Sequence, residues 1–396
     1  MLKFLGKAFL IIALIAATVY GWIYFTIKAD LEHEEDEIVE EVNQVVEDVV
    51  TDETPSKVEV VENEEISKEI NVLPTLVDKL TTNSAWCGTM QLVWNDFMNV
   101  AGGTPVFLEE NIFAENLNKK TFSTEDLSDE YYYKKFGKKT LALKKEIENG
   151  IKDKFNETSD VLDLLDWSED ALDPNVEGVD RFIFYAMLKR DFEYPQEFTV
   201  LDNGKFKDND NIKYFGINSE TNKSVDKQLD VLYYENEDDF AIEIATKDKD
   251  KILLVRKDAF ETNFNDIYKS VKSKANSYEG SKTFEAIDEF KMPNLEIDVL
   301  RNYDELSGEK FTAPKADGII NAAMQTIKFN IDEKGGSIKS EAVMDVTFTS
   351  SIMLPEDKPE PRYFYCDDEF VMFLVEEGKE NPYFAVKVDD ITLFQK

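Results

Sequence analysis

The strongest constraint on the fold lies near the carboxyl terminus, in the stretch FVMFLVEEGKENPYFAVKV. It holds two apolar runs, Phe370–Glu376 and Tyr383–Val388, joined by a turn at Gly378. Runs of this length that are rich in aromatic and β-branched residues predict strands. The chain is therefore expected to end in two strongly apolar strands.

Further segments extend the same pattern upstream. Arg181–Arg190 is a long apolar run of the kind found in the middle of a sheet. Met90–Ala101 has apolar residues at helical spacing and closes on Gly102-Gly103, which predicts a helix. Thr140–Phe155 reads as a polar helix that ends at Asn156, and a third helix is predicted at Asn263–Ser277. The remaining predicted strands are Lys213–Ile217, Leu229–Tyr234, Phe240–Thr246, Lys251–Val255, Glu296–Leu300 and Gln325–Asp332. Helices gather in the first half and mostly antiparallel strands in the second, without a βαβ rhythm, which predicts an α+β fold.

The charge of the chain excludes several classes of function. Among 396 residues, 45 are basic and 82 acidic, giving a net charge of −37. Such a charge argues against nucleic acid and anionic membrane surfaces as partners. The single histidine, His33, lies in an acidic run, so no Ser–His or Cys–His centre and no His-based zinc site is expected in the folded region. No nucleotide-binding motif occurs and no carboxylate pair stands out, so we predict neither an enzyme nor a cofactor.

The two cysteines leave an alternative open. Cys87 and Cys366 are far apart in the sequence. They would be able to form a disulfide if the domain lies outside the cell. They would equally serve as two small buried side chains.

The amino terminus has the pattern of a membrane anchor. Ala8–Ile27 is a run of 20 residues without a charge, preceded by Lys3 and Lys7 and ending in bulky aromatic residues. At ~1.5 Å per residue this run spans a bilayer core of about 30 Å. The lysines predict a cytoplasmic amino terminus and an extracellular domain, in a single-pass cell-membrane protein. A cleaved signal peptide is the alternative, but its apolar core is usually shorter and ends in small residues.

The next segment is strongly acidic. Asp30–Glu69 contains 17 acidic residues and two lysines. Ile38, Val42, Val45 and Val49 form a short apolar stripe, too short to hold a coiled coil firmly. We interpret this segment as a solvated, partly helical or disordered tether. The predicted organisation is an anchor at 1–28, a tether at 29–72 and a folded domain at 73–396.

One stretch, IDEKGGSIKSEAVMD at Ile331–Asp345, alternates in polarity after a charged turn. One face would carry Gly336, Ile338, Ser340, Ala342 and Met344, none of which is charged. The other face would carry Ser337, Lys339, Glu341 and Asp345, which we expect to be in solvent. This period of two is typical of a half-buried strand, and also of a loop that is able to become one.

Several segments in the second half resemble the serpin family. Ile331–Gly335 is similar to the end of the serpin strand that leads into the hinge of the reactive loop, and the carboxyl-terminal hairpin resembles the two closing serpin strands. Arg181–Pro195 resembles the central strand of the main sheet, with Phe192 in place of the family's tryptophan. Lys291–Leu295 followed by Tyr303–Leu306 is similar to the family's proline-bearing strand and the short helix after it, and Asn83–Trp86 is a weaker match to the family's first core strand. The resemblance covers roughly Thr81–Lys396 and implies a serpin-like α+β fold with an exposed reactive-type loop near the carboxyl terminus.

The resemblance also implies a mechanism. A protease cuts the loop, which then enters the main sheet as a new strand. The implied hinge comprises Glu333, Lys334, Gly335, Gly336, Ser337, Ile338, Ser340 and Ala342. Counting by the family's loop length places the cut at Thr349-Ser350, with Met353-Leu354 as the other candidate. No Lys or Arg lies between Lys339 and Lys358, which disfavours trypsin-like targets.

The implied function is therefore that of a suicide inhibitor of a serine or cysteine protease. Ile338 is bulkier than the small residues usual in the family's hinge, which would slow loop entry. Two alternatives remain open at the level of sequence. One is a non-inhibitory serpin-like module that binds an unknown protein or ligand at the cell surface. The other is an unrelated α+β envelope protein.

Overall fold

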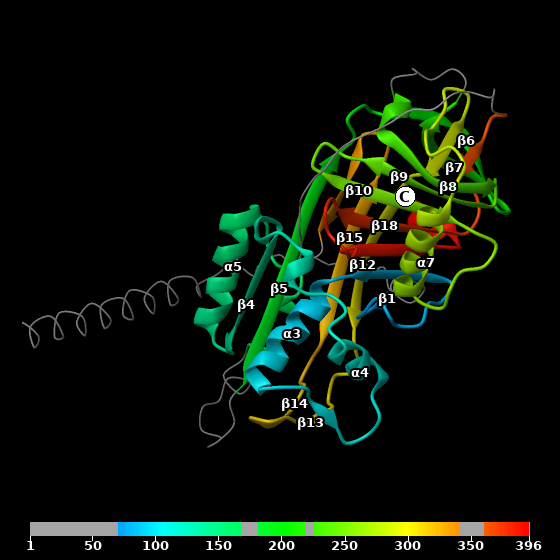
Figure 1. Cartoon of the computed structure of the whole chain (residues 1–396). Coiled ribbons are helices and arrows are strands. Elements are labelled where there is room, and N and C mark those ends of the chain that lie inside the picture. The colour runs from blue at the N-terminus through cyan, green and yellow to red at the C-terminus, as the bar shows by residue number, and fades with distance from the viewer. Residues whose placement is uncertain (1–69, 168–180, 219–224, 340–359, 396) are drawn as a thin grey trace, which may run out of the picture. The chain divides into compact units, whose positions relative to one another are not determined.

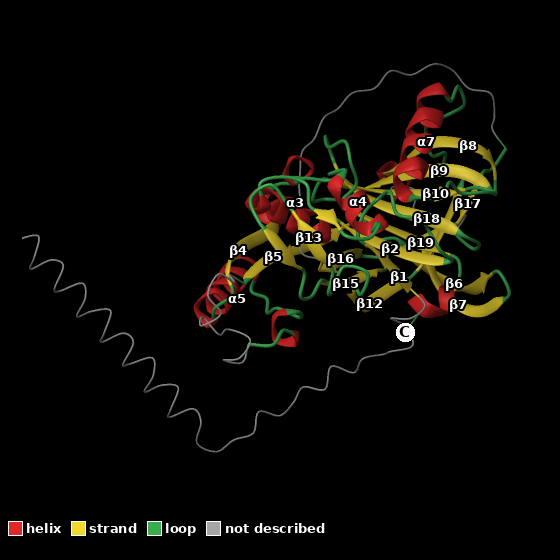
Figure 2. Ribbon diagram, turned by 90° about the horizontal axis from the view of Figure 1, so that it is seen from below, coloured by secondary structure: helices red, strands yellow, loops and turns green. Residues whose placement is uncertain are grey.

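The computed structural model describes residues 70–167, 181–218, 225–339 and 360–395. These residues belong to one unit of the chain, Asn63–Lys396. They contain four α-helices and four sheets (Figures 1 and 2). The helices are α3 (Thr89–Ala101), α4 (Ile112–Asn118), α5 (Leu141–Phe155) and α7 (Phe264–Ser277), and the 3-10 helices are Thr124–Asp126, Asp129–Tyr131, Leu162–Leu164, Val225–Gln228 and Ile391–Phe394.

The seven-stranded sheet forms much of the core. Its order is β1 (Ile70–Leu73), β2 (Asn83–Cys87), β19 (Phe384–Val388), β18 (Phe370–Glu376), β10 (Asp250–Arg256), β9 (Asp239–Ala245) and β8 (Leu229–Asn236). Only the pair of β1 and β2 is parallel. Every residue of β18 is buried, as its continuous apolar sequence requires.

A five-stranded sheet, antiparallel throughout, lies against the seven-stranded one. Its order is β12 (Leu295–Asn302), β15 (Met324–Ile331), β16 (Gly335–Lys339), β5 (Phe182–Glu193) and β4 (Tyr132–Lys138). In Figure 1 the long strands of this sheet run across those of the seven-stranded sheet. The two sheets meet in the core, where the rings of Phe329 and Phe384 have centroids 4.8 Å apart.

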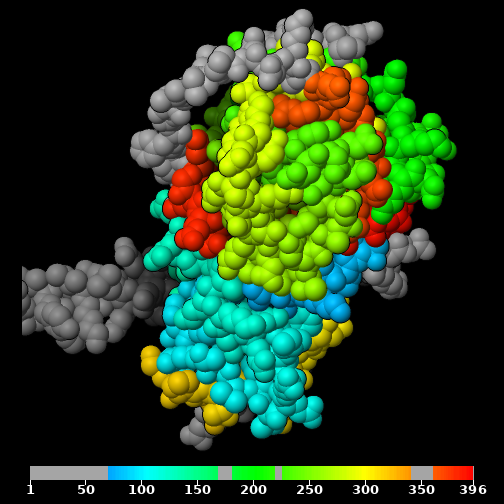
Figure 3. Space-filling view, turned by 45° about the vertical axis from the view of Figure 1, so that its right-hand side comes forward, coloured from blue at the N-terminus to red at the C-terminus, as the bar shows by residue number. Residues whose placement is uncertain are grey.

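Two smaller sheets complete the described fold. One has the order β17 (Tyr363–Tyr365), β11 (Glu289–Pro293), β7 (Asn209–Ile217) and β6 (Thr199–Phe206). The other has the order β14 (Asp317–Ile319), β13 (Lys310–Thr312) and β3 (Val106–Phe107). In the space-filling view of Figure 3, the chain around α7 and β8–β10 covers the upper part of one face and the chain around α4 the lower part.

Capping residues in the sequence determine where several of the helices begin and end. Thr140 accepts a hydrogen bond from the Leu143 amide at the start of α5, and Asn263 accepts one from Asp266 at the start of α7. Helix α3 ends at Gly102, whose φ of 80° lies in the left-handed region. Helix α5 packs Leu143, Ile147 and Ile151 against the outer face of β5.

The predicted α+β class with mostly antiparallel sheets is confirmed. The predicted helices and strands occur, and Phe370–Glu376 has the predicted bounds. Strand β1 begins at Ile70, so the last residues of the predicted tether belong to the sheet. Cys87 and Cys366 are both buried, and no disulfide joins them.

The predictions for the amino-terminal segment concern residues that the structure does not describe. The predicted anchor Ala8–Ile27 and the acidic tether up to Glu69 lie outside the described residues. Among the residues that are described, no helix is both long enough and apolar enough to cross a membrane.

Candidate functional site

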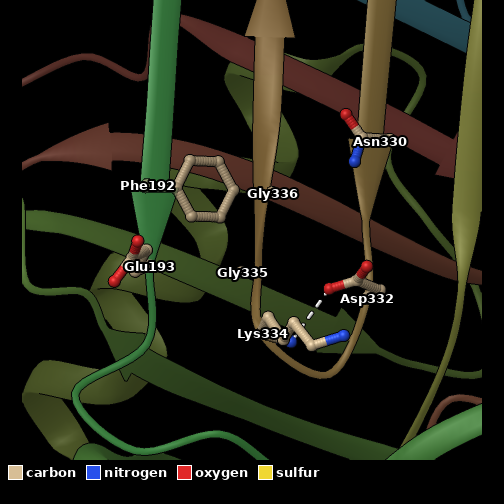
Figure 4. Close-up of a pocket in the computed structure, with 7 residues that line it drawn as sticks. All are labelled: Phe192, Glu193, Asn330, Asp332, Lys334, Gly335 and Gly336. Carbon is tan, nitrogen blue, oxygen red and sulfur yellow. Dashed lines mark hydrogen bonds between the residues drawn. The ribbon is translucent and has the colours of Figure 1, made fainter.

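The predicted hinge begins in a tight turn between β15 and β16. The Asp332 amide donates to the carbonyl of Gly335 at 2.9 Å, and the Lys334 amide donates to Asp332 Oδ1 at 2.9 Å (Figure 4). Gly335 has φ of 151°, and a Cβ there would lie 2.1 Å from the Phe192 carbonyl oxygen. Only glycine therefore fits at this position beside β5.

The turn is bound to the chain that follows β5. The Tyr194 amide donates to the Lys334 carbonyl at 3.0 Å, and the Phe198 amide donates to the Glu333 carbonyl at 2.8 Å. The side chains of Glu333 and Lys334 form an ion pair at 2.9 Å. Glu333, Lys334 and Gly335 are thus fixed at one end of the five-stranded sheet.

The next hinge residues form the middle strand of that sheet. Strand β16 pairs antiparallel with both β15 and β5, and Ile338 lies opposite Phe329 on one side and Arg190 on the other. Ile338 is fully buried, whereas Gly336 and Ser337 are half-buried. A Cβ on Gly336 would lie 2.5 Å from the Asn330 carbonyl oxygen and 2.7 Å from the Phe192 ring, so the strand fits only without a side chain there (Figure 4).

The remaining predicted site residues are not described. Ser340, Ala342 and the candidate scissile pairs Thr349-Ser350 and Met353-Leu354 lie outside the described residues. The first described residues after residue 359 include Arg362, which is held by several polar contacts. Arg362 Nη2 contacts Asp288 Oδ2 at 2.6 Å and Nη1 donates to the Ser281 carbonyl at 2.8 Å, and Asp288 is fully buried at its side chain.

The prediction that Lys339 faces solvent is wrong. Its side chain is only 14% exposed and pairs with Glu157 at 3.2 Å and with Asp160 at 3.0 Å. Burial disfavours the Lys339 charge, but the hydrogen bonds and charges of Asp160 and Glu157 outweigh burial, and the pKa of Lys339 is raised. In the sequence, the only sign of these ion pairs is that two carboxylates, Glu157 and Asp160, follow shortly after a predicted helix.

The outer face of the sheet beside β16 is covered as well. Tyr185 and Met187 of β5 are buried against α5. Sequence alternation predicts water on this face because it does not show that a helix packs there. A residue that entered the sheet after Lys339 would therefore meet protein on both faces.

Both neighbours of β16 continue beyond its end. Strand β16 pairs with Lys189–Glu193 of β5 and with Lys328–Ile331 of β15. Residues 182–188 of β5 and 324–327 of β15 extend further along the sheet, and no other described strand pairs with the edges they turn toward each other. In the same register, Ser340 would oppose Leu188 and Ile327, and Ala342 would oppose Ala186 and Gln325.

A buried ion pair lies directly beside Ile338, and sequence analysis missed it. The side chain of Arg190 on β5 is fully buried and donates through Nε to the Asp250 carboxylate and through Nη2 to the Asp248 carbonyl. The Tyr131 ring lies 3.9 Å from the guanidinium carbon. Burial disfavours the Arg190 charge, but Tyr383, Asp250 and Tyr131 outweigh it and raise the pKa. A charged residue, Arg190, that directly follows the apolar part of the run Arg181–Arg190 is the only signal that the sequence gives.

The cavities at this site are small. One hollow of about 150 Å³ is lined by Phe192, Glu193, Asn330, Asp332, Lys334, Gly335 and Gly336 (Figure 4). Pockets that bind drug-sized ligands usually hold about 300–1,000 Å³, so this hollow is too small for one. Among the described residues, no group of three or more His, Cys, Asp or Glu side chains is placed to hold a metal ion.

Known proteins were compared with the chain by sequence and by structure. No protein-family model and no curated protein matches the sequence. The structure is similar to Serpin48, a highly specific serpin of the insect Tenebrio molitor, with 12% identity and a TM-score of 0.39 over 78% of this chain and 92% of the other. It is also similar to thyroxine-binding globulin in complex with thyroxine, with 11% identity and a TM-score of 0.38 over 77% and 92%. Both belong to the family that the sequence resembles.

Proposed function

We propose that the chain is a protease inhibitor that acts by inserting a cut loop into its five-stranded sheet. The observation that carries this proposal is the position of β16 between β15 and β5, both of which continue beyond its end. A loop cut beyond Lys339 would be able to lengthen β16 along those strands. Each added residue would gain backbone hydrogen bonds to two neighbours.

The side chains after Lys339 suit this extension. In the register of β16, Ser340 and Ala342 would turn toward the core, beside Leu188 and Ala186, which are buried. Both are small and uncharged, so their entry would not place a charge in an apolar region. The target protease would supply the nucleophile, and this chain would contribute no catalytic residue.

The loop sequence limits the target. With no Lys or Arg between Lys339 and Lys358, a protease whose pocket requires a cation would find no site. Cutting at Thr349-Ser350 or Met353-Leu354 suits subtilisin-like, chymotrypsin-like or cysteine proteases. We further propose that Ala8–Ile27 anchors the protein in the cell membrane with the domain outside.

A second candidate function is favoured by the same strand. In the uncut chain, β16 is already in the sheet, with Ile338 fully buried and Lys339 paired to Glu157 and Asp160. A strand held this firmly would be permanent. The protein would then be a non-inhibitory module that binds a protein or ligand at the cell surface.

Cleavage distinguishes the two functions. The full chain would be incubated with subtilisin-like and chymotrypsin-like proteases, and its melting temperature would be measured before and after a cut near Thr349. An inhibitor is expected to give a covalent protease complex that persists in denaturing gels, and a cut form that melts at a higher temperature. A nicked chain with an unchanged melting temperature and no complex would overturn the inhibitor proposal and leave the binding module.

A further inference from the structure

Three lysines lie in one row across the five-stranded sheet. Lys339 of β16 is directly opposite Lys328 of β15 and directly opposite Lys189 of β5. Directly opposed residues of antiparallel strands point to the same face, with Cβ atoms about 4.5–5.5 Å apart. Like charges at this spacing destabilise a sheet, so the row requires compensation.

The compensation comes from the chain that follows α5. Glu157 contacts Lys189 at 3.0 Å and Lys339 at 3.2 Å. Asp160 contacts Lys339 at 3.0 Å and Lys328 at 3.1 Å. Each carboxylate thus bridges the middle lysine to one of the outer ones. In addition, the Thr158 carbonyl accepts from Lys339 Nζ at 3.0 Å, and Asp191 lies 3.3 Å from Lys189.

The middle lysine depends on these partners more than the outer two. The side chain of Lys339 is 14% exposed, against 24% for Lys189 and 41% for Lys328. Burial raises the pKa of Glu157, but its hydrogen bonds to Lys189 and Lys339 outweigh burial, so the pKa of Glu157 is lowered. If β16 left the sheet, the pair of Glu157 with Lys189 and the pair of Asp160 with Lys328 would still be able to form, because neither pair includes a residue of β16. Only the partners of Lys339 would be lost.

We infer that Glu157 and Asp160 form an ionic clasp that determines whether β16 stays in the sheet of the uncut chain. With the clasp in place, Lys339 gains two carboxylates on entering. Without it, Lys339 enters between two positive charges. The inference concerns the uncut chain and needs no protease, so it does not rest on the proposed function.

Hydrogen exchange of the β16 amides tests the clasp. We compare the wild-type chain with Glu157→Gln plus Asp160→Asn, and with the same pair of changes in a Lys339→Met background. Removing the clasp is expected to accelerate exchange at Gly336–Lys339 about tenfold, the effect of two half-buried ion pairs. In the Lys339→Met background the same changes are expected to leave β16 nearly unaffected, because the middle charge is gone.

Salt and a matched variant complete the design. Screening at about 1 M salt, where the Debye length is about 3 Å, should accelerate β16 exchange in the wild type but not in Lys339→Met. The effect should be smaller than that of removing the clasp, because partly buried pairs are screened less than exposed ones. Glu243→Gln removes a comparable pair, with Lys251 at 2.8 Å, and should leave β16 unchanged. Amides of α5 serve to detect detachment of the helix. Equal loss of β16 protection with and without Lys339, or no loss at all, would overturn the inference.

Discussion

Arg190 places a positive charge in the protein interior beside the candidate hinge. Its side chain joins β5 to Asp250 of β10, and Ile338 of β16 is its direct neighbour in the five-stranded sheet. Moving a charge out of water costs several kcal/mol, which the partner has to offset. We interpret the pair as a device that fixes the position of β5 at the edge of β16.

Removing the carboxylate should therefore be costly. Asp250→Asn is expected to lower the free energy of unfolding by about 3–5 kcal/mol, because the buried guanidinium loses its counter-charge. Denaturant unfolding followed by circular dichroism measures the change. The control Glu305→Gln removes the carboxylate that pairs with Arg301. The Glu305 side chain is 38% exposed, so this change should cost less than about 0.5 kcal/mol. Equal costs for the two variants would contradict the role given to Arg190.

Two glycines allow two effects of a glycine-to-alanine change to be measured separately: lack of space for the Cβ atom and an unfavourable backbone conformation. Gly336 lacks room for a Cβ, whereas Gly308 has φ of 86° and nothing within 4 Å of the Cβ position. Gly336→Ala should cost about 1–3 kcal/mol through crowding against β15 and β5. Gly308→Ala should cost about 1–2 kcal/mol through its left-handed backbone. Only the change at Gly336 should accelerate amide exchange in β16, and acceleration by both or by neither would contradict this view of the strand.

At the scale of elements, the covered outer face of β5 changes how insertion has to be tested. Alternation alone makes Glu341→Arg the harmless control for Ala342→Arg, because it places Glu341 in solvent. In the register of β16, however, Glu341 would oppose Met187, which is buried under α5. A better control is Glu356→Arg, since Glu356 follows both candidate scissile bonds and would not enter the sheet.

Ala342→Arg should act only after the loop is cut. In the lengthened strand, residue 342 would lie between Ala186 and Gln325, both buried, so an arginine there would carry an unpaired charge into the core. The uncut variant is expected to melt like the parent, and the cut variant to lose the gain in melting temperature shown by the cut parent. Glu356→Arg should retain that gain. If Ala342→Arg already destabilises the uncut chain by several kcal/mol, residue 342 belongs to a permanent strand.

The sequence predicts those helices and strands whose own side-chain pattern is sufficient to indicate the secondary structure. The run Phe370–Glu376 is apolar at nearly every position, and β18 has these bounds. The sequence of strand β4, YYKKFGK, does not predict a strand, because its lysines interrupt the apolar alternation. The segment becomes a strand by pairing with β5. Helix α4 has only seven residues and gives little periodic signal.

The same distinction applies to the candidate site, where local features are predictable from the sequence and long-range contacts are not. The turn and the alternation after it are visible in the sequence because glycines and a period of two are local features. The partners of Lys339 lie on the segment after α5, and the partner of Arg190 lies on β10. Such contacts join residues far apart in the chain, and they arise from the packing of whole elements rather than from any motif. A lysine within an alternating pattern therefore reads as exposed when it is not.

At the scale of the whole molecule, the predicted anchor and tether would set the side of the membrane on which the domain lies. With Ala8–Ile27 in the membrane and lysines on its amino-terminal side, the domain should lie outside the cell. Protease added to intact cells that carry the full chain is expected to cut the tether and release the domain. A cytoplasmic marker should stay intact, and lysed cells serve to show that the tether is cleavable. Release only after lysis would place the domain inside.

The attachment at Arg362 has a consequence for the molecule after a cut. The chain beyond the loop returns through β17 into β18 and β19, which lie inside the seven-stranded sheet between β10 and β2. Arg362 and the fully buried Asp288 secure its first residues. A single cut near Thr349 would break one covalent bond and leave these strands interleaved with the rest of the domain. The product would be two polypeptides that migrate as one particle and separate only when the entire fold is lost.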